Sequence, residues 1–273
     1  MSNDKLDILT QLRTEREMGY KGGLYHITQI DFAYNSNHIE GSTLTSDETR
    51  YIYETNSLVL DKNEAVNIDD IVETLNHFKC FDYLLDVAEN DLSEEIIKAF
   101  HRILKEGTSD EKKPYFAVGD YKKIENTVGN VDTTMPDKVP EAMRNLLESY
   151  NYTLSEYPDA KDLEKLEKLI GFHVRFERIH PFQDGNGRVG RLIMFKECLR
   201  IGISPFIIED KNRAFYLRGI RRYDVDRTQL YETIRHEQEI FDGRYEKFAF
   251  PKDDISQETS TKNRKDRERG GER

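Results

Sequence analysis

The chain has 273 residues, enough for one large domain or two modest ones, and 37% of them are hydrophobic while 34% are charged. The formal net charge of -11 argues against a general attraction to nucleic acid or to an anionic membrane surface. No apolar run approaches the roughly 20 residues that cross a bilayer, and residues 1–15 lack the apolar stretch of a secretory signal. Two cysteines are too few for a disulfide framework. We therefore expect a cytoplasmic protein that binds neither nucleic acid nor membrane.

Helical periodicity dominates the first third of the chain. Apolar residues recur at steps of three and four around residues 27–34 and again over 68–85, as the buried stripe of a helix requires. Gly41 offers a stop for the first of these helices, and Thr45 with Glu48 forms the pattern of a capping box. We expect residues 1–91 to form an N-terminal helical region.

The middle of the chain is predicted to be a helical domain over residues 92–225. Ser93 is placed as an N-cap, Pro140 suits a first helical turn, and Gly202 stops a helix that begins near Arg188. The segment 118–135 interrupts this rhythm with β-formers between glycines, which predicts an exposed β-hairpin.

The end of the chain is predicted to be a helix over residues 226–251 followed by a disordered tail. Residues 252–273 contain a single aliphatic side chain and cannot bury a core. In total the pattern predicts an all-α protein of about seven to nine helices that carries one β-hairpin.

The segment HPFQDGNGRVGR, residues 180–191, concentrates chemistry that suits a nucleotide phosphate. Glycines and a helix start provide backbone N–H groups for an anion, and the guanidinium groups of Arg188 and Arg191 suit phosphate oxygens. Asp184 is a hard oxygen ligand for Mg²⁺, and His180 can take up a proton near neutral pH. The G-x-G-x-x-G pattern within it does not follow a hydrophobic strand, which argues against a dinucleotide-binding fold.

The same segment resembles the Fic family motif H-x-F-x-(D/E)-G-N-G-R-x-x-R at all its defined positions. The resemblance implies the helical Fic fold and a nucleotidyltransferase that moves AMP from ATP to a hydroxyl group of a target protein. It implies that His180 is the base and that Asp184 holds Mg²⁺ against the phosphates. The remaining residues implied to bind the nucleotide in this loop are Gly185, Asn186, Gly187, Arg188, Val189, Gly190 and Arg191.

The resemblance also implies roles outside the loop. The predicted hairpin corresponds to the flap of the family, which aligns the target segment by main-chain pairing. Its residues nearest the nucleotide would be Val128, Gly129, Asn130 and Val131. Tyr216 would line the adenine pocket, although ordinary interior packing is the alternative for this side chain.

Residues 36–41, SNHIEG, match the inhibitory pattern (S/T)-x-x-x-E-(G/N) of the family through Ser36, Glu40 and Gly41. In that family the glutamate pairs with the second arginine of the motif, here Arg191, at the place of the γ-phosphate. The resemblance therefore implies an adenylyltransferase inhibited by its own N-terminal region, with a homodimer as a possible assembly. The alternatives left open are removal of AMP, transfer of another nucleotide on the same fold, and a nucleotide-sensing interaction protein without catalysis.

Overall fold

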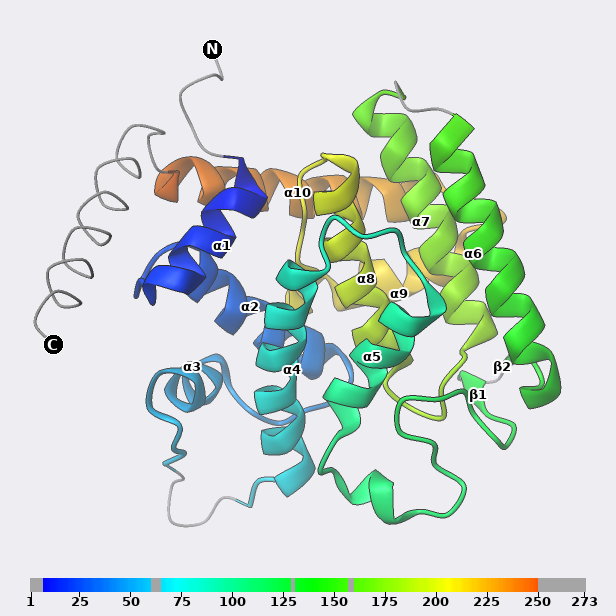
Figure 1. The fold of residues 1–273 in the computed structure, drawn as a ribbon, viewed down its shortest axis with the longest axis horizontal. Helices are drawn as coiled ribbons and strands as arrows, with labels where there is room; N and C mark the ends of the chain where they lie inside the picture. Colours follow the sequence, from blue (N-terminus) through cyan, green and yellow to red (C-terminus); the bar gives the residue numbers. More distant parts are fainter. Residues whose placement is uncertain (1–6, 60–64, 129–130, 157–159, 250–273) are drawn as a thin grey trace, which may run out of the picture. The chain divides into compact units, whose positions relative to one another are not determined.

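The computed structural model describes residues 7–59, 65–128, 131–156 and 160–249, and the regular secondary structure in these ranges is almost entirely helical (Figure 1). The helices are α1 (Ile8–Met18), α2 (Leu24–Ile39), α3 (Ser46–Thr55), α4 (Ile68–Asp86), α5 (Glu94–Lys105), α6 (Val139–Glu156), α7 (Asp162–Ile179), α8 (Asn186–Ile201), α9 (Arg213–Arg222) and α10 (Thr228–Phe248). The all-α prediction is confirmed. The ten α-helices found in these ranges slightly exceed the predicted number, and short elements such as α9, of 10 residues, show no long periodic pattern.

The chain divides into two compact units. Residues 28–241 span the larger unit, which contains every predicted site residue, and the described part of the other unit consists of residues 7–27 and 242–249. The predicted boundary at residue 92 and the predicted tail remain predictions, because residues 250–273 lie outside the described part of the chain. Within the described helices, none has both the length and the apolar character that a bilayer crossing requires.

Helix α8 lies at the centre of the larger unit. It packs against α4, α5 and α7, and nearly all of its residues from 186 to 198 are buried. Phe195 near its C-terminal end stacks on Phe32 of α2 and meets Phe81 of α4 edge to face. The charged residues of α8 are therefore buried as well, so each of them needs a partner of opposite charge.

The helix ends follow the predicted signals. Thr45 and Glu48 form the capping box of α3, and the Ser93 hydroxyl accepts a hydrogen bond from the backbone N–H of Ile96 at the start of α5. Pro140 lies in the first turn of α6, and Gly202 ends α8 in the left-handed conformation. These four expectations are confirmed.

The predicted hairpin is present but short. Strand β1 (Thr127–Val128) pairs antiparallel with β2 (Val131–Asp132), with Thr127 opposite Asp132 and Val128 opposite Val131. Residues 129–130 at its tip lie outside the described residues. A hairpin of this length is marginal by itself and depends on contacts with its surroundings.

Gly202 provides a test of how α8 is terminated. Its φ of 72° lies in the left-handed region, and a Cβ at this position would meet nothing within 4 Å. Gly202→Ala should therefore lower the free energy of unfolding by about 1 kcal/mol through backbone strain alone. Urea unfolding measures the loss, and Gly202→Asn should lose less because asparagine tolerates this conformation. Equal stability of Gly202→Ala and wild type would contradict this account.

Candidate active site

The loop between α7 and α8 is held in a tight, partly strained turn. Helix α7 ends at Ile179, and His180 adopts a φ of 51°, a left-handed conformation uncommon for a residue other than glycine. Gly185, with a φ of 81°, then starts α8 at Asn186, two residues earlier than the predicted start. The earlier start places the first free N–H groups of α8 directly at the end of the glycine-rich loop.

Two side chains fasten the middle of this loop to the protein interior. The Asn186 amide donates to the carbonyl of Phe182 at 2.9 Å, and its oxygen accepts from the N–H of Phe182 at 2.8 Å. The Phe182 ring is fully buried and stacks on the ring of His101 with centroids 4.0 Å apart. The loop is therefore anchored on both its backbone and its apolar side.

The surroundings of His180 favour its unprotonated ring. Its Nδ1 lies 3.3 Å from the carbonyl oxygen of Glu177, so in the neutral ring this nitrogen carries the proton and Nε2 is left as the acceptor. Burial lowers the pKa of His180, and the nearby Lys122 ammonium lowers it further, while the Glu177 hydrogen bond opposes both effects. At pH 7 the imidazole is thus mostly neutral, as proton abstraction requires.

Arg191 is buried, and its Nε and Nη2 donate to α2 and to the residue that follows this helix. Its Nε donates to the Ser36 hydroxyl at 3.0 Å, and its Nη2 donates to the Ser36 carbonyl at 2.8 Å and to the Glu40 carboxylate at 2.7 Å. Gly41, with a φ of 103°, directs the chain away after Glu40. The structure therefore brings the predicted residues Ser36, Glu40 and Arg191 together.

The Glu40 carboxylate also lies over the first turn of α8. A Cβ at Gly187 would overlap Glu40 Oε1, so glycine permits the carboxylate to approach the positive end of the helix dipole. Burial opposes ionisation of Glu40, but the charges of Arg191 and Arg188 outweigh it and lower the pKa of this carboxyl. Glu40 is thus an anion bound where the loop offers an anion site.

Asp184 belongs to a second cluster of charges on the other side of the loop. Its Oδ2 lies 2.7 Å from Lys105 Nζ and 3.1 Å from Arg188 Nη2. Lys105 also contacts Glu73 at 2.6 Å and Asp110 at 2.5 Å, and Arg188 pairs with Glu73. Burial raises the pKa of the Asp184 carboxyl, but Arg188 and Lys105 reverse this and hold it well below its usual range.

The donor set at Asp184 fits a magnesium ion that is shared with phosphate oxygens. Oxygen atoms of Glu73, Asp110 and Asp184 lie within 4.8 Å of one another, but the Lys105 ammonium already contacts all three carboxylates. Asp184 alone of the three is open to solvent, with 54% of its side chain exposed. Mg²⁺ commonly takes one or two protein carboxylates and completes its shell with phosphates and water. Asp184 can provide such a ligand.

A buried set of polar groups lies behind Arg191 on α7. Glu177 faces Gly190 of α8, and its Oε1 has no hydrogen-bond partner. Burial and the nearby Glu40 carboxylate raise the pKa of Glu177 to about 8. His173 is also buried, as expected of an interior histidine, and its Nε2 lies 2.6 Å from the hydroxyl of Tyr216. Tyr216 is 2% exposed, so its ring lies in the interior beside this cluster.

The base of the hairpin is hydrogen-bonded to the loop between α7 and α8. Lys122 Nζ donates to Asn126 Oδ1 at 2.7 Å and to the hydroxyl of Thr133 at 2.6 Å. The Asn126 amide donates in turn to the carbonyl of Phe182 at 3.0 Å. The backbone of Val128 and Val131 forms the two strands, whereas Gly129 and Asn130 lie outside the described residues, so their predicted role stays a prediction.

Several residues of this site were not predicted from the sequence: Glu73, Lys105, Asp110, Lys122 and Glu177. One signal was available for Lys105, which continues the apolar stripe of α5 one helical turn after His101 and is buried. A charged residue in a buried stripe needs a partner, although the stripe does not say which.

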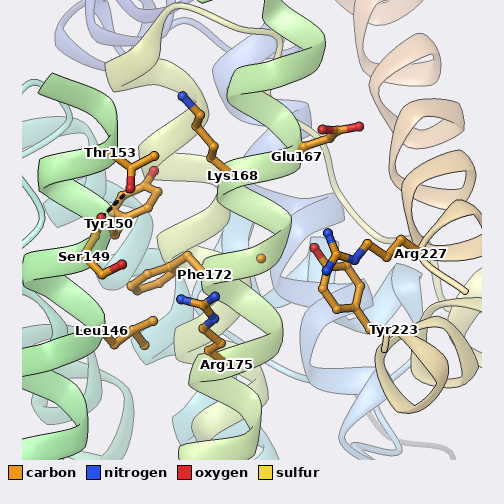
Figure 2. A pocket seen from close by; sticks show the side chains of 11 residues that line it. Leu146, Ser149, Tyr150, Thr153, Glu167, Lys168, Phe172, Arg175, Tyr223 and Arg227 are labelled. Carbon is orange, nitrogen blue, oxygen red and sulfur yellow. Dashed lines mark hydrogen bonds between the residues drawn. The ribbon is translucent and has the colours of Figure 1, made fainter. Parts of the chain in front are cut away.

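A separate hollow of about 310 Å³ lies away from this loop. Figure 2 shows its lining, with Tyr150 from α6, Phe172 and Arg175 from α7, and Tyr223 and Arg227 from the segment between α9 and α10. None of the predicted site residues lines it.

Glu177 should make stability depend on pH. Because its pKa is raised in the folded protein, the unfolded chain releases this proton first as pH rises, and stability falls between about pH 4.5 and 8. In wild type the free energy of unfolding should fall by about 2–4 kcal/mol over this window because of Glu177, and Glu177→Gln should abolish that fall. Urea unfolding at pH 5 and pH 8 measures it. Glu167→Gln, at an exposed position on the same helix, is the control and should show the same change in unfolding free energy between pH 5 and pH 8 as wild type. If Glu177→Gln also shows the wild-type change, the assignment is refuted.

Sequence comparisons place this geometry among known proteins. Residues 91–198 match the sequence model of the Fic/DOC family. The chain is 31% identical over 189 residues to protein adenylyltransferase Fic of Nematostella vectensis, covering 67% of this chain and 40% of that protein. It is 28% identical over 201 residues to protein adenylyltransferase fic-1 of Caenorhabditis elegans, covering 71% and 36%. The chain thus spans about two fifths or less of the length of these relatives.

Solved structures show the same fold. A Fic domain containing signaling protein from Bacteroides thetaiotaomicron superposes with a TM-score of 0.67 at 20% identity, covering 86% of this chain and 93% of that chain. A structure of Fic-1 from C. elegans gives a TM-score of 0.63 at 19% identity, covering 86% and 70%. At these identities the likeness concerns the fold, while the family model and the curated relatives concern the sequence. The chain therefore carries, over residues 91–198, a domain of the Fic/DOC family.

Proposed function

We propose that this chain is a protein adenylyltransferase that transfers AMP from ATP to a hydroxyl group of a target protein, and that Glu40 restrains it. The observation that carries the proposal is the arrangement of one loop, in which a neutral His180 precedes a helix N-terminus flanked by Arg188 and Arg191. The match to the Fic/DOC family and the relatives named protein adenylyltransferases support the same reaction.

The chemical step follows from the state of His180. Nε2 takes the proton of the target hydroxyl while Nδ1 keeps its hydrogen bond to Glu177, so the ring becomes an imidazolium without turning. The hydroxyl oxygen forms a bond to the α-phosphorus, and the bond from that phosphorus to the pyrophosphate oxygen breaks. The N–H groups at the start of α8 and the two guanidinium groups stabilise the charge on the phosphate oxygens.

Magnesium would be held by Asp184 on its solvent-exposed side. When bound, the ion would supply positive charge that neutralises part of the charge developing on the leaving pyrophosphate. Lys105 and Arg188 fix the carboxylate of Asp184 from the buried side, which leaves its outer face for the ion. Because cations occupy the buried side of this carboxylate, its exposed side supports a single metal ion shared with the nucleotide.

The restraint acts on Arg191. A guanidinium that already donates to Ser36 and Glu40 has fewer donors left for a γ-phosphate, and the Glu40 carboxylate repels phosphate at the same place. ATP would then bind weakly or without its phosphates in line. The target would approach along the hairpin, whose strand edges can pair with an extended segment through main-chain hydrogen bonds.

Removal of the Glu40 carboxylate should raise auto-modification. With ATP and Mg²⁺, intact mass spectrometry should show an added AMP at least tenfold faster in Glu40→Gly than in wild type, because Arg191 becomes free for phosphate. Glu40→Gln should be intermediate, since the amide keeps a hydrogen bond but not the charge. The double variant Glu40→Gly/His180→Ala should add no AMP. Unchanged modification in Glu40→Gly would sink the restraint, and modification in the double variant would sink the role of His180.

Asp184 and Asp110 allow the metal role to be tested with a matched pair. In the Glu40→Gly background, Asp184→Asn should reduce the rate at saturating ATP by at least tenfold and raise the Mg²⁺ concentration needed for half-maximal rate. Asp110→Asn also removes a negative charge beside Lys105, but the Asp110 side chain is only 13% exposed, so the Mg²⁺ dependence of this variant should equal that of the parent. Equal Mg²⁺ dependence of both variants would contradict the assignment to Asp184.

A further inference from the structure

Lys122 is a buried lysine whose ammonium contacts no carboxylate among the described residues. It is 3% exposed, and its ammonium donates to Asn126 Oδ1, to the Thr133 hydroxyl and, at 3.4 Å, to the carbonyl of Ile179. Burial lowers the pKa of Lys122 to about 8, so at pH 7 most molecules still carry the charge. A buried cation held only by neutral oxygens is unfavourable unless the site uses its charge or its three donors.

Lys122 contacts the residues directly before and directly after His180 in the chain. The backbone N–H of Lys122 donates to the carbonyl of Pro181 at 2.8 Å, directly after the histidine, and its ammonium reaches the carbonyl of Ile179 at 3.4 Å, directly before it. Between these two carbonyls His180 holds its left-handed conformation. A strained backbone persists only where its surroundings fix it, and Lys122 fixes this one on both sides.

The same ammonium fixes the hairpin. Asn126 precedes β1 and Thr133 follows β2, and the Thr133 hydroxyl also donates to the carbonyl of Asn126 at 2.8 Å. Lys122 therefore joins the two ends of the hairpin to each other and to the catalytic loop. Its three N–H groups match three acceptors, two in the hairpin base and one at the end of α7.

The charge of Lys122 acts on the same histidine. Burial is the largest influence on the pKa of His180 and lowers it, as does the Lys122 ammonium, while the carboxylates of Glu40 and Asp184 raise it. The charge of Lys122 therefore opposes the effect of these two carboxylates on the imidazole. A residue fastened to the hairpin thus adds to the effect of burial in favouring the neutral ring.

We propose that Lys122 is a positioning residue that couples the β1–β2 hairpin to His180, holding the histidine in its strained turn and keeping its ring unprotonated. The proposal rests on the proposed function in taking His180 as the base. It extends that function because the hairpin, where a target segment would pair, is then linked to the ability of His180 to accept a proton. The neighbouring Lys123 is exposed and provides a matched control.

The first test needs no catalysis. In the full chain, the imidazole signals of His180, assigned by their absence in His180→Ala, are titrated by NMR. Lys122→Met should raise the midpoint by about half a pKa unit or more, because a nearby cation is lost and water gains access. Lys123→Met should keep the wild-type midpoint. If Lys122→Met does not fold, Lys122→Gln carries the same test, since it also removes the charge.

The second test separates rate from binding. In the Glu40→Gly background, Lys122→Met should lower the rate of auto-modification at saturating ATP by at least tenfold at pH 7 and leave the KM for ATP within twofold, because Arg188 and Arg191 are untouched. An unchanged His180 midpoint, or an unchanged rate, in a folded Lys122 variant overturns the proposal. If Glu40→Gly itself transfers no AMP, the proposed function fails, while the titration of His180 still decides whether Lys122 acts on it.

Discussion

The burial of two arginines at the start of α8 is the constraint on which the site depends. Arg188 and Arg191 are each 4% exposed and stand at the positive end of a helix dipole, so their charges must be neutralised nearby. Glu73 and Asp184 do this for Arg188, and Glu40 does it for Arg191. Because these carboxylates come from α4, from the loop and from the end of α2, the charge of one helical turn fixes how three segments meet.

This charge balance supports the proposed restraint by an internal carboxylate. A phosphate group and the Glu40 carboxylate offer Arg191 the same kind of partner, so one can replace the other with little change in local charge. Glu40 is 36% exposed and follows the last residue of α2, so it can leave without disrupting a core position. Glu73 cannot be exchanged in this way, since it is buried between Arg188 and Lys105. Glu40 is thus an anionic partner that phosphate can replace, and Glu73 is one that stays in place.

The sequence was informative where the chemistry is contiguous. Residues 180–191 lie on one loop and helix, and the turns at Pro181, Gly185 and Gly202 follow from the conformational limits of proline and glycine. The contact between Glu40 and Arg191 joins residues 151 positions apart, and only the resemblance to a family predicted it. The partners of Lys105 and Lys122 were not predicted, because a periodic pattern shows that a side chain is buried but not what it meets. The depth of Tyr216 was open for the same reason.

The loop is held at both of its ends, and the charges of the two residues that hold it both affect the pKa of His180. Lys122 holds the end at His180, and Glu40 holds the end at Arg191. Glu40 favours the protonated form of His180, so its departure alone would lower the pKa of the ring further. Phosphates that take its place return negative charge to the same region and oppose that fall. In both states burial is the main reason that the ring stays neutral, and the charge of Lys122, which belongs to neither the proposed restraint nor the nucleotide, acts in the same direction.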